Sequence, residues 1–122
     1  LRYIHENKTA ALLTASIRLG AMSANATPTQ LAAVSDFGRA LGLAFQVIDD
    51  ILDVTQTSEK LGKSAGKDAA AQKATYPAVM GLEKSRLEAG RLTRQAHDAL
   101  RPLGKKAATL RALANYLLER EY

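Results

Sequence analysis

One stretch of the chain, residues 41–53 (LGLAFQVIDDILD), restricts the possible fold more than any other. Its polar side chains share a helical spacing of i, i+3, i+4 and i+7, which places them on one face: Gln46, Asp49, Asp50 and Asp53. The neighbouring positions are apolar, whereas a helix on a protein surface usually has a wide polar face. A solvent-exposed face is the simplest alternative interpretation. However, the four side chains form a narrow polar stripe, which favours the central helix of a bundle. The carboxylates of the stripe would then face an internal cleft.

The rest of the sequence is also typical of helices, because Ala and Leu dominate and no long alternating pattern indicates a strand. Helices are expected at about 3–22, 28–54, 76–82, 84–100 and 105–120. The second of them has a suitable beginning, with Thr27 as N-cap residue ahead of Pro28. The polar segment 55–68 is expected to be a flexible active-site loop. These features predict an all-α fold in a single domain, residues 1–122.

Composition excludes several classes of protein. The chain has no cysteine, which excludes a disulfide scaffold, thiol catalysis and zinc held by cysteine. Its two histidines, His5 and His97, are far apart and are not in the spacing of metal ligands. No uncharged apolar run approaches about 18 residues, so no transmembrane span is expected. The first residues are polar, which argues against a secretory signal. The absence of cysteine fits a reducing compartment, and a cytoplasmic location is expected.

Charge is unevenly distributed along the chain, whose formal net charge is +5. Residues 1–59 contain 4 Lys and Arg against 6 Asp and Glu, and residues 60–122 contain 13 against 6. A basic half can bind nucleic acid or phosphate groups. Only 5% of the residues are aromatic, and no basic run includes stacking side chains, which argues against nucleic acid. A P-loop is excluded as well, because Thr57 stands where that motif requires a glycine before Gly62.

The acidic stripe suits a divalent cation. Its three carboxylates repel one another, and only Arg39, near the start of the stripe, could offset their charge from the same face. Mg²⁺ prefers oxygen ligands and commonly binds one or two carboxylates together with substrate phosphates. Phosphate groups would need cationic partners, and lysines follow the stripe at positions 60, 63, 67 and 73.

The chain contains two consecutive motifs, LAFQVIDDILD and LGKSAGKDAAAQKATYPAVMGLE, that strongly resemble those of the trans-isoprenyl diphosphate synthases, the polyprenyl synthetase family. Within that family it looks most like the bacterial farnesyl and geranyl diphosphate synthases. Residues 49–53 match the second aspartate-rich motif, DDxxD, and Lys8 and Thr9 match the Lys-Thr pair of the preceding helix. Lys63 and Lys73 match the two lysines after the motif. The resemblance implies an all-α fold, the C-terminal part of an isoprenoid-synthase-type helical bundle.

The resemblance also implies a reaction. Isopentenyl diphosphate is condensed with an allylic diphosphate, dimethylallyl or geranyl, to give a short-chain product such as farnesyl diphosphate, and pyrophosphate is released. In the intact family site, three Mg²⁺ ions and basic side chains neutralise the charge on the leaving pyrophosphate. A homodimer, with no membrane span and no nucleic acid, is implied as well.

By correspondence with the family, Asp49 is the direct ligand of one Mg²⁺ ion. Asp50 and Asp53 complete the metal site, mainly through water and outer contacts. The residues that would hold the allylic diphosphate are lysines: Lys8, Lys63 and Lys73.

Three further residues match the substrate site of the family. Thr9 and Gln46 would present oxygen dipoles to the carbocation, and Phe45 would line the substrate site. Considered by itself, Thr9 could equally be a mid-helix hydroxyl bonded to its own helix, and Phe45 is more often a core residue.

Two elements of the family pattern are missing. The sequence contains a single DDxxD motif, whereas the family needs a first aspartate-rich motif for the other Mg²⁺ ions and upstream basic residues for isopentenyl diphosphate. The chain is therefore expected to be the C-terminal segment of a longer synthase, inactive by itself. The alternatives are a non-catalytic helical partner or regulatory subunit, an anion-binding helical module and, as a weaker match, a terpene cyclase.

Overall fold

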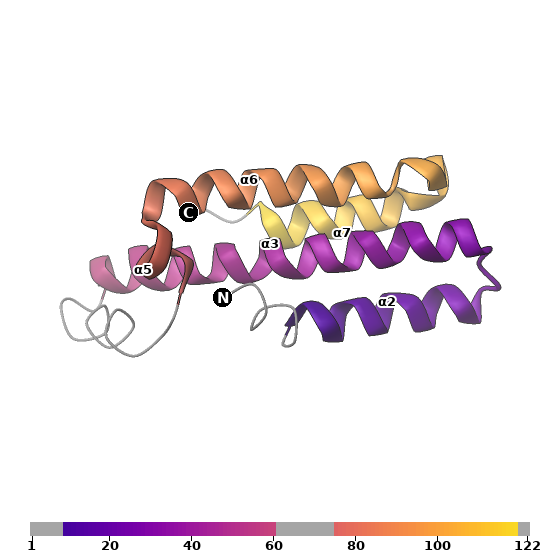
Figure 1. Cartoon of the computed structure of the whole chain (residues 1–122), viewed down its shortest axis with the longest axis horizontal. Helices are drawn as coiled ribbons and strands as arrows, with labels where there is room; N and C mark the ends of the chain where they lie inside the picture. The colour runs from indigo at the N-terminus through magenta and orange to yellow at the C-terminus, as the bar shows by residue number, and fades with distance from the viewer. Residues whose placement is uncertain (1–8, 61–74, 120–122) are drawn as a thin grey trace.

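The chain folds into helices throughout the part that the structure describes. This computed structural model describes residues 9–60 and 75–119, and no strand occurs among them. Figure 1 shows the helices in chain order: α2 (Ala11–Ser23), α3 (Pro28–Lys60), α5 (Tyr76–Met80), α6 (Leu82–Ala99), the 3₁₀ helix η2 (Arg101–Ala107) and α7 (Ala108–Leu118). The all-α fold class predicted from the sequence is confirmed.

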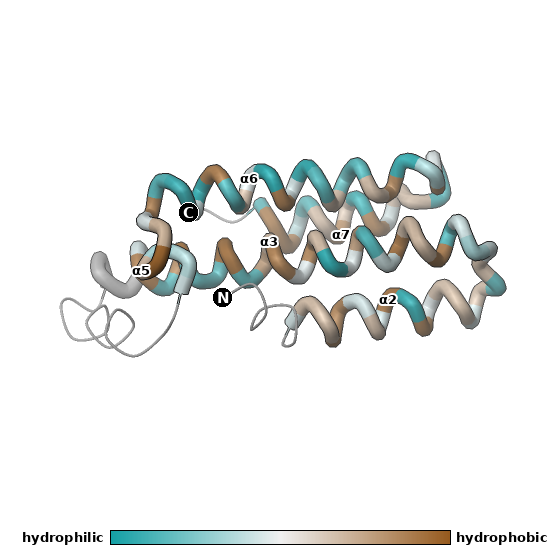
Figure 2. Tube along the Cα trace, in the orientation of Figure 1, coloured by the Kyte–Doolittle hydropathy of each residue, from teal (hydrophilic) through white to brown (hydrophobic). Residues whose placement is uncertain are grey.

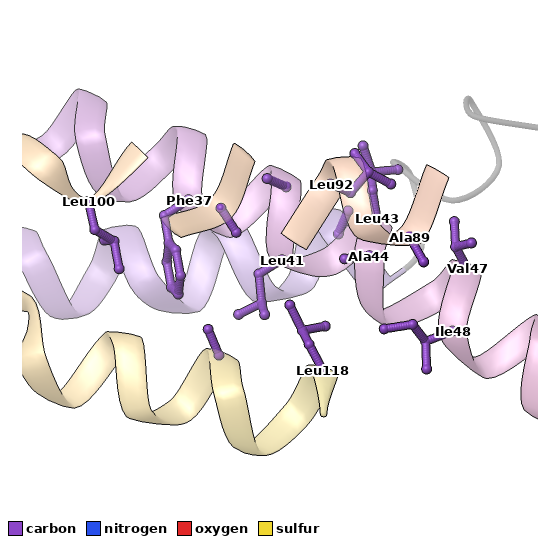
Figure 3. Close-up of a cluster of buried hydrophobic side chains, with 14 of the residues drawn as sticks. Phe37, Leu41, Leu43, Ala44, Val47, Ile48, Ala89, Leu92, Leu100 and Leu118 are labelled. Atoms are coloured by element: carbon purple, nitrogen blue, oxygen red, sulfur yellow. The ribbon is translucent and has the colours of Figure 1, made fainter. Parts of the chain in front are cut away.

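Helix α3 is the central element, because α2, α6 and α7 all pack against it. In Figure 1, α2 runs along one side of α3, and α6 and α7 run along the other. The largest fully buried hydrophobic side chains come from the contact of α3 with the C-terminal part of the chain (Figure 3): Phe37, Leu41, Val47, Ile48, Leu92 and Leu100. Ile51 is also fully buried. By contrast, α2 has no buried residue, and α6 is mostly hydrophilic along its length (Figure 2). The central position predicted for this helix is confirmed.

The beginning of α3 is a capping box. The Gln30 backbone N–H donates to Thr27 Oγ1 (3.2 Å), and the Thr27 N–H donates to Gln30 Oε1 (2.9 Å). Each side chain thus satisfies a backbone donor of the other residue. Pro28 occupies the first helical position, where no N–H is needed. The predicted N-cap role of Thr27 is confirmed.

The C-terminal end of α3 differs from the prediction. The helix continues to Lys60, whereas the sequence pattern placed its end near residue 54, so residues 55–60 of the predicted loop are helical. The reason is local, because neither Gly nor Pro occurs between Thr55 and Gly62. In addition, the Thr55 hydroxyl donates to the Ile51 carbonyl (2.9 Å) and so does not oppose the helix. The remainder of the predicted loop, 61–68, lies outside the described residues.

Two glycines with positive φ separate the C-terminal helices. Gly81 (φ 87°) lies between α5 and α6, and Gly104 (φ 56°) kinks η2. Because side chains disfavour positive φ, glycine is well suited to both positions. The last α-helix consequently begins at Ala108 and not near residue 105, as its apolar pattern had indicated.

Part of α3, Pro28–Gln56, is long and apolar enough to cross a membrane, with a mean hydropathy of 1.3. However, 67% of this apolar stretch is buried inside the structure. A helix at the centre of a bundle is apolar on most sides because it packs against other helices. Length and composition are therefore weak evidence for a membrane span, and packing against three helices accounts for the apolar character of α3.

Helices α2 and α3 are in close contact near the beginning of α2. A Cβ atom on Gly42 would lie 2.3 Å from Ala10 Cα, and one on Gly38 would lie 2.9 Å from Thr14 Cα. Any side chain at these positions would force the two helices apart, since a packed interior has little free space. The glycines thereby bring the residue that precedes Ala10 against the middle of α3.

Candidate active site

A series of hydrogen bonds connects Thr9, in the turn before α2, with the acidic part of α3. The Thr9 hydroxyl donates to Gln46 Oε1 (Oγ1 to Oε1, 3.1 Å), and Gln46 Nε2 donates to Asp50 Oδ1 (3.3 Å). Gln46 and Asp50 are one helical turn apart and share a face of α3. Thr9 is distant from both in sequence, so the packing of α2 on α3 brings these groups together.

Asp50 also binds the beginning of α5. Its Oδ2 accepts a hydrogen bond from the backbone N–H of Tyr76 (3.3 Å), the first residue of that helix. The Thr75 hydroxyl accepts from the Ala78 N–H (3.2 Å) and caps the same helix. Asp50 is only 9% exposed and Tyr76 only 7%, so water has little access to the bond between them. The carboxylate of Asp50 therefore connects α3 with α5.

The other two carboxylates of the DDxxD motif face solvent. Asp49 and Asp53 are exposed, and their i, i+4 spacing places them next to each other on α3. The burial of the polar stripe thus differs along its length, because Gln46 and Asp50 bond to Thr9 and to the beginning of α5. Asp49 and Asp53 are exposed. Whether all four side chains face one internal cleft, as the sequence predicts, stays a prediction, because the described residues show only that their burial differs.

The exposed pair suits Mg²⁺. Within residues 9–60 and 75–119, no group of three or more His, Cys, Asp and Glu side chains is placed to hold a metal ion. Mg²⁺ does not require such a group, since it binds one or two carboxylates and completes its coordination with water and phosphate oxygens. Asp49 and Asp53 offer two carboxylates one turn apart, so the donors fit this ion when a diphosphate supplies further oxygens.

A groove of about 570 Å³ lies next to the Thr9 end of the site. Its lining combines small side chains with two cations: Ala10, Ala11, Thr14, Ala15, Arg18 and Arg39. Arg18 donates to the Ser35 hydroxyl, and Arg39 Nη1 lies 3.4 Å from Asp36 Oδ1. The groove could not be predicted from the sequence, because its walls come from two helices and carry no recognisable motif.

The sequence also matches a known family. The polyprenyl synthetase family model covers residues 1–116. The chain belongs to the polyprenyl synthetase family.

Curated relatives of this chain are much longer. A chloroplastic geranylgeranyl pyrophosphate synthase of Catharanthus roseus is 50% identical, over 99% of this chain and 34% of the relative. The large subunit 1 of a heterodimeric, chloroplastic geranylgeranyl pyrophosphate synthase of Arabidopsis thaliana is 52% identical, over 99% of this chain and 33% of the relative. The chain therefore spans about a third of the length of these curated relatives.

A solved structure of a polyprenyl synthetase supports the same assignment. It is a crystal structure of a candidate farnesyl-diphosphate synthase from Marinomonas sp. MED121, which matches with a TM-score of 0.77 and 38% identity. The match covers 96% of this chain and 38% of that one. The family and the helical bundle predicted from the sequence are confirmed.

The structure describes some of the predicted site residues and not others. Phe45 is half-buried and packs against the core, in line with the core interpretation. The Thr9 hydroxyl donates to Gln46 on α3. The lysines expected to hold the diphosphate lie outside the described residues: Lys8, Lys63 and Lys73. Thr75 is not among the predicted residues, although a threonine two residues before Pro77 is a typical helix start.

Proposed function

We propose that this chain is the part of a Mg²⁺-dependent prenyltransferase that binds the allylic diphosphate. The observation that carries the proposal is the division of the DDxxD motif. Asp49 and Asp53 are exposed carboxylates, while Asp50 is buried in a hydrogen-bonded series with Gln46 and Thr9. Family membership supports this assignment, because the exposed carboxylates and the hydrogen-bonded series both lie within the residues that the family model matches.

The proposed reaction joins two diphosphate substrates. The C–O bond of the allylic diphosphate breaks, and its electron pair leaves with pyrophosphate. The double bond of isopentenyl diphosphate then forms a C–C bond to the allylic cation, and a proton is lost to the released pyrophosphate. When bound, Mg²⁺ neutralises the negative charge that develops on the leaving group.

The residues of this chain would bind and orient the allylic substrate. Asp49 and Asp53 would hold Mg²⁺ through their exposed carboxylates. Thr9 and Gln46 would direct oxygen atoms at the cation, and Phe45 would shape the neighbouring wall. The cations for the diphosphate would be lysines: Lys8, Lys63 and Lys73.

The product is proposed as a short-chain isoprenyl diphosphate. Farnesyl diphosphate was expected from the resemblance, whereas two curated relatives are named geranylgeranyl pyrophosphate synthases. Chromatography of the products formed by the complete enzyme from dimethylallyl and isopentenyl diphosphates would distinguish the two. A second aspartate-rich motif does not occur in residues 1–122, so we propose that this chain acts with further residues that supply it.

Hydrogen exchange measured on the 122-residue chain would test the proposal. Methylenebisphosphonate, a non-hydrolysable pyrophosphate analogue, should slow exchange of the backbone amides in residues 49–56 only when Mg²⁺ is present. Replacing both Asp49 and Asp53 by asparagine should abolish that protection. Asp36→Asn is the matched control, because Asp36 is an exposed carboxylate on the same helix that pairs with Arg39.

Two results would contradict the proposal. Protection that persists in the Asp49→Asn, Asp53→Asn variant would show that these carboxylates do not hold the metal. Protection that needs no Mg²⁺ and falls steeply with added salt would favour the anion-binding helical module instead, since ionic contacts alone behave in that way.

We also propose that the complete protein is a cytoplasmic homodimer. The outer side of α2 carries exposed apolar residues that another subunit could cover: Leu12, Leu19 and Met22. One relative is named as a subunit of a heterodimer, and both curated plant relatives are named chloroplastic. Sedimentation velocity of the complete protein tests the assembly, and a monomer at micromolar concentration would contradict it.

A further inference from the structure

The hydrogen bonds among Asp50, Gln46 and Thr9 have a direction, and charge sets it. An ionised carboxylate only accepts hydrogen bonds, whereas an amide side chain has one donating and one accepting end. Asp50 therefore faces Gln46 Nε2 (3.3 Å from Oδ1), which leaves Gln46 Oε1 at the other end, 3.1 Å from Thr9 Oγ1. Because Oε1 cannot donate, the Thr9 hydroxyl must direct its proton at Gln46.

We propose that Asp50 is a positioning residue that acts through Gln46 to keep the Thr9 proton turned inward and the lone pairs of Oγ1 available to the substrate. The inference rests on the proposed function, in which that substrate becomes an allylic cation. Lone pairs stabilise a developing positive charge, whereas a hydroxyl proton in the same place would repel it. Asp50 would thus contribute to the reaction without touching the metal or the substrate.

The surroundings of Asp50 suit this role better than that of a metal ligand. Its side chain is buried, with 9% exposure, whereas Asp49 and Asp53 on the same helix are exposed. Its second oxygen accepts from the Tyr76 N–H (3.3 Å), so the carboxylate cannot rotate without losing that bond. The positioning group is therefore fixed from two sides, by α3 and by the beginning of α5.

The Thr9 end of the series is fixed by backbone contact. Gly42 lies one turn before Gln46, and a Cβ atom there would lie 2.3 Å from Ala10 Cα. This close approach holds the adjacent Thr9 within hydrogen-bond distance of Gln46. A series fixed at both ends can transmit the direction of its hydrogen bonds without a change in the fold.

Asp50→Asn provides a test because it is isosteric and should reverse the series. Its oxygen can still accept from the Tyr76 N–H, while its new NH₂ group faces Gln46. The Gln46 amide should then rotate, presenting Oε1 to the new NH₂ group and Nε2 to Thr9, so that the Thr9 proton turns outward. Adding Gln46→Glu to Asp50→Asn moves the negative charge one turn along α3 and restores an acceptor for the Thr9 proton.

Nuclear Overhauser effects on the 122-residue chain report the rotation directly. In the unmodified chain, the Gln46 side-chain amide protons should give cross-peaks to the Asp50 β-protons. In Asp50→Asn, they should give cross-peaks to the Thr9 side chain instead, while the Tyr76 amide remains protected from exchange. Unchanged cross-peaks in Asp50→Asn would overturn the proposal at its first step.

Steady-state kinetics of the complete enzyme report the consequence. Asp50→Asn should lower kcat by about 100- to 1,000-fold, the scale of losing one oriented dipole, with KM changed by no more than about 3-fold. The Asp50→Asn, Gln46→Glu variant should recover most of kcat. Thr9→Val removes the hydroxyl, so adding Asp50→Asn to it should cause no further loss of kcat.

The remaining outcomes separate this inference from the proposed function. If Asp50→Asn weakens Mg²⁺ binding and Gln46→Glu does not restore kcat, then Asp50 is a metal ligand and the positioning role is wrong. If the unmodified protein neither binds Mg²⁺ nor transfers a prenyl group, then the proposed function is wrong. The cross-peaks would still decide whether Asp50 sets the direction of the series.

Discussion

Replacing Gly42 by alanine should push α2 away from α3 and break the hydrogen bond between Thr9 and Gln46. A Cβ atom at this position would lie 2.3 Å from Ala10 Cα and 2.7 Å from Ala10 Cβ. Non-bonded carbon atoms pack at about 3.5–4.0 Å, so the two helices must separate locally by about 1 Å or more. The distance from Thr9 Oγ1 to Gln46 Oε1, now 3.1 Å, would then exceed hydrogen-bond range.

The energetic effect of Gly42→Ala follows from three contributions. Overpacking of a close contact costs about 1–3 kcal/mol, and loss of the Thr9 hydrogen bond costs about 0.5–1.5 kcal/mol. Alanine in the middle of a helix regains about 0.5–1 kcal/mol. We therefore expect the free energy of unfolding to fall by about 2 kcal/mol, measured by urea denaturation of the 122-residue chain and followed by circular dichroism.

Two other glycines provide matched controls. Gly20 is on α2, and a Cβ atom there would have nothing within 4 Å, so Gly20→Ala should raise the free energy of unfolding by about 0.5–1 kcal/mol. Gly38→Ala should fall between the two, since its Cβ atom would lie 2.9 Å from Thr14 Cα. The reasoning is refuted if Gly42→Ala is as stable as the unmodified chain or if Gly20→Ala loses as much stability.

Two further predictions concern stability alone, and urea denaturation measures both. Thr27→Ala should lower the free energy of unfolding by about 0.5–2 kcal/mol because it removes the N-cap of α3, whereas replacing the exposed Thr29 should have little effect; equal losses would contradict the capping assignment. Leu92→Ala should cost about 2–5 kcal/mol, as expected for a fully buried leucine. Leu87→Ala on the same helix, where the residue is 67% exposed, should cost less than about 0.5 kcal/mol.

Local patterns predicted much of this fold. The apolar content around residues 41–53 indicated a central helix, and α3 has that position. Thr27 ahead of Pro28 indicated a helix start, and the capping box begins there. The end of α3 was placed too early because polar residues after position 54 suggested a loop. In the absence of Gly and Pro such residues can extend a helix.

The candidate site was predicted less completely. Helical spacing places Gln46, Asp49, Asp50 and Asp53 on one face of α3. Spacing alone does not show which of these side chains another segment will cover. Asp50 is buried because the beginning of α5 meets it there, while Asp49, its neighbour in sequence, is exposed. The identity of the acidic residues was thus predictable, and the difference in their burial was not.

The sequence by itself determined the helical class, the family and the order of the chemical groups, because periodicity and motifs depend on neighbours along the chain. Only the tertiary structure decided which of those groups meet. Thr9 reaches Gln46 because Gly42 has no side chain to separate α2 from α3, and Asp50 holds the first residue of α5. Both contacts join segments that are distant in sequence, so their geometry depends on how whole helices pack and not on any local pattern.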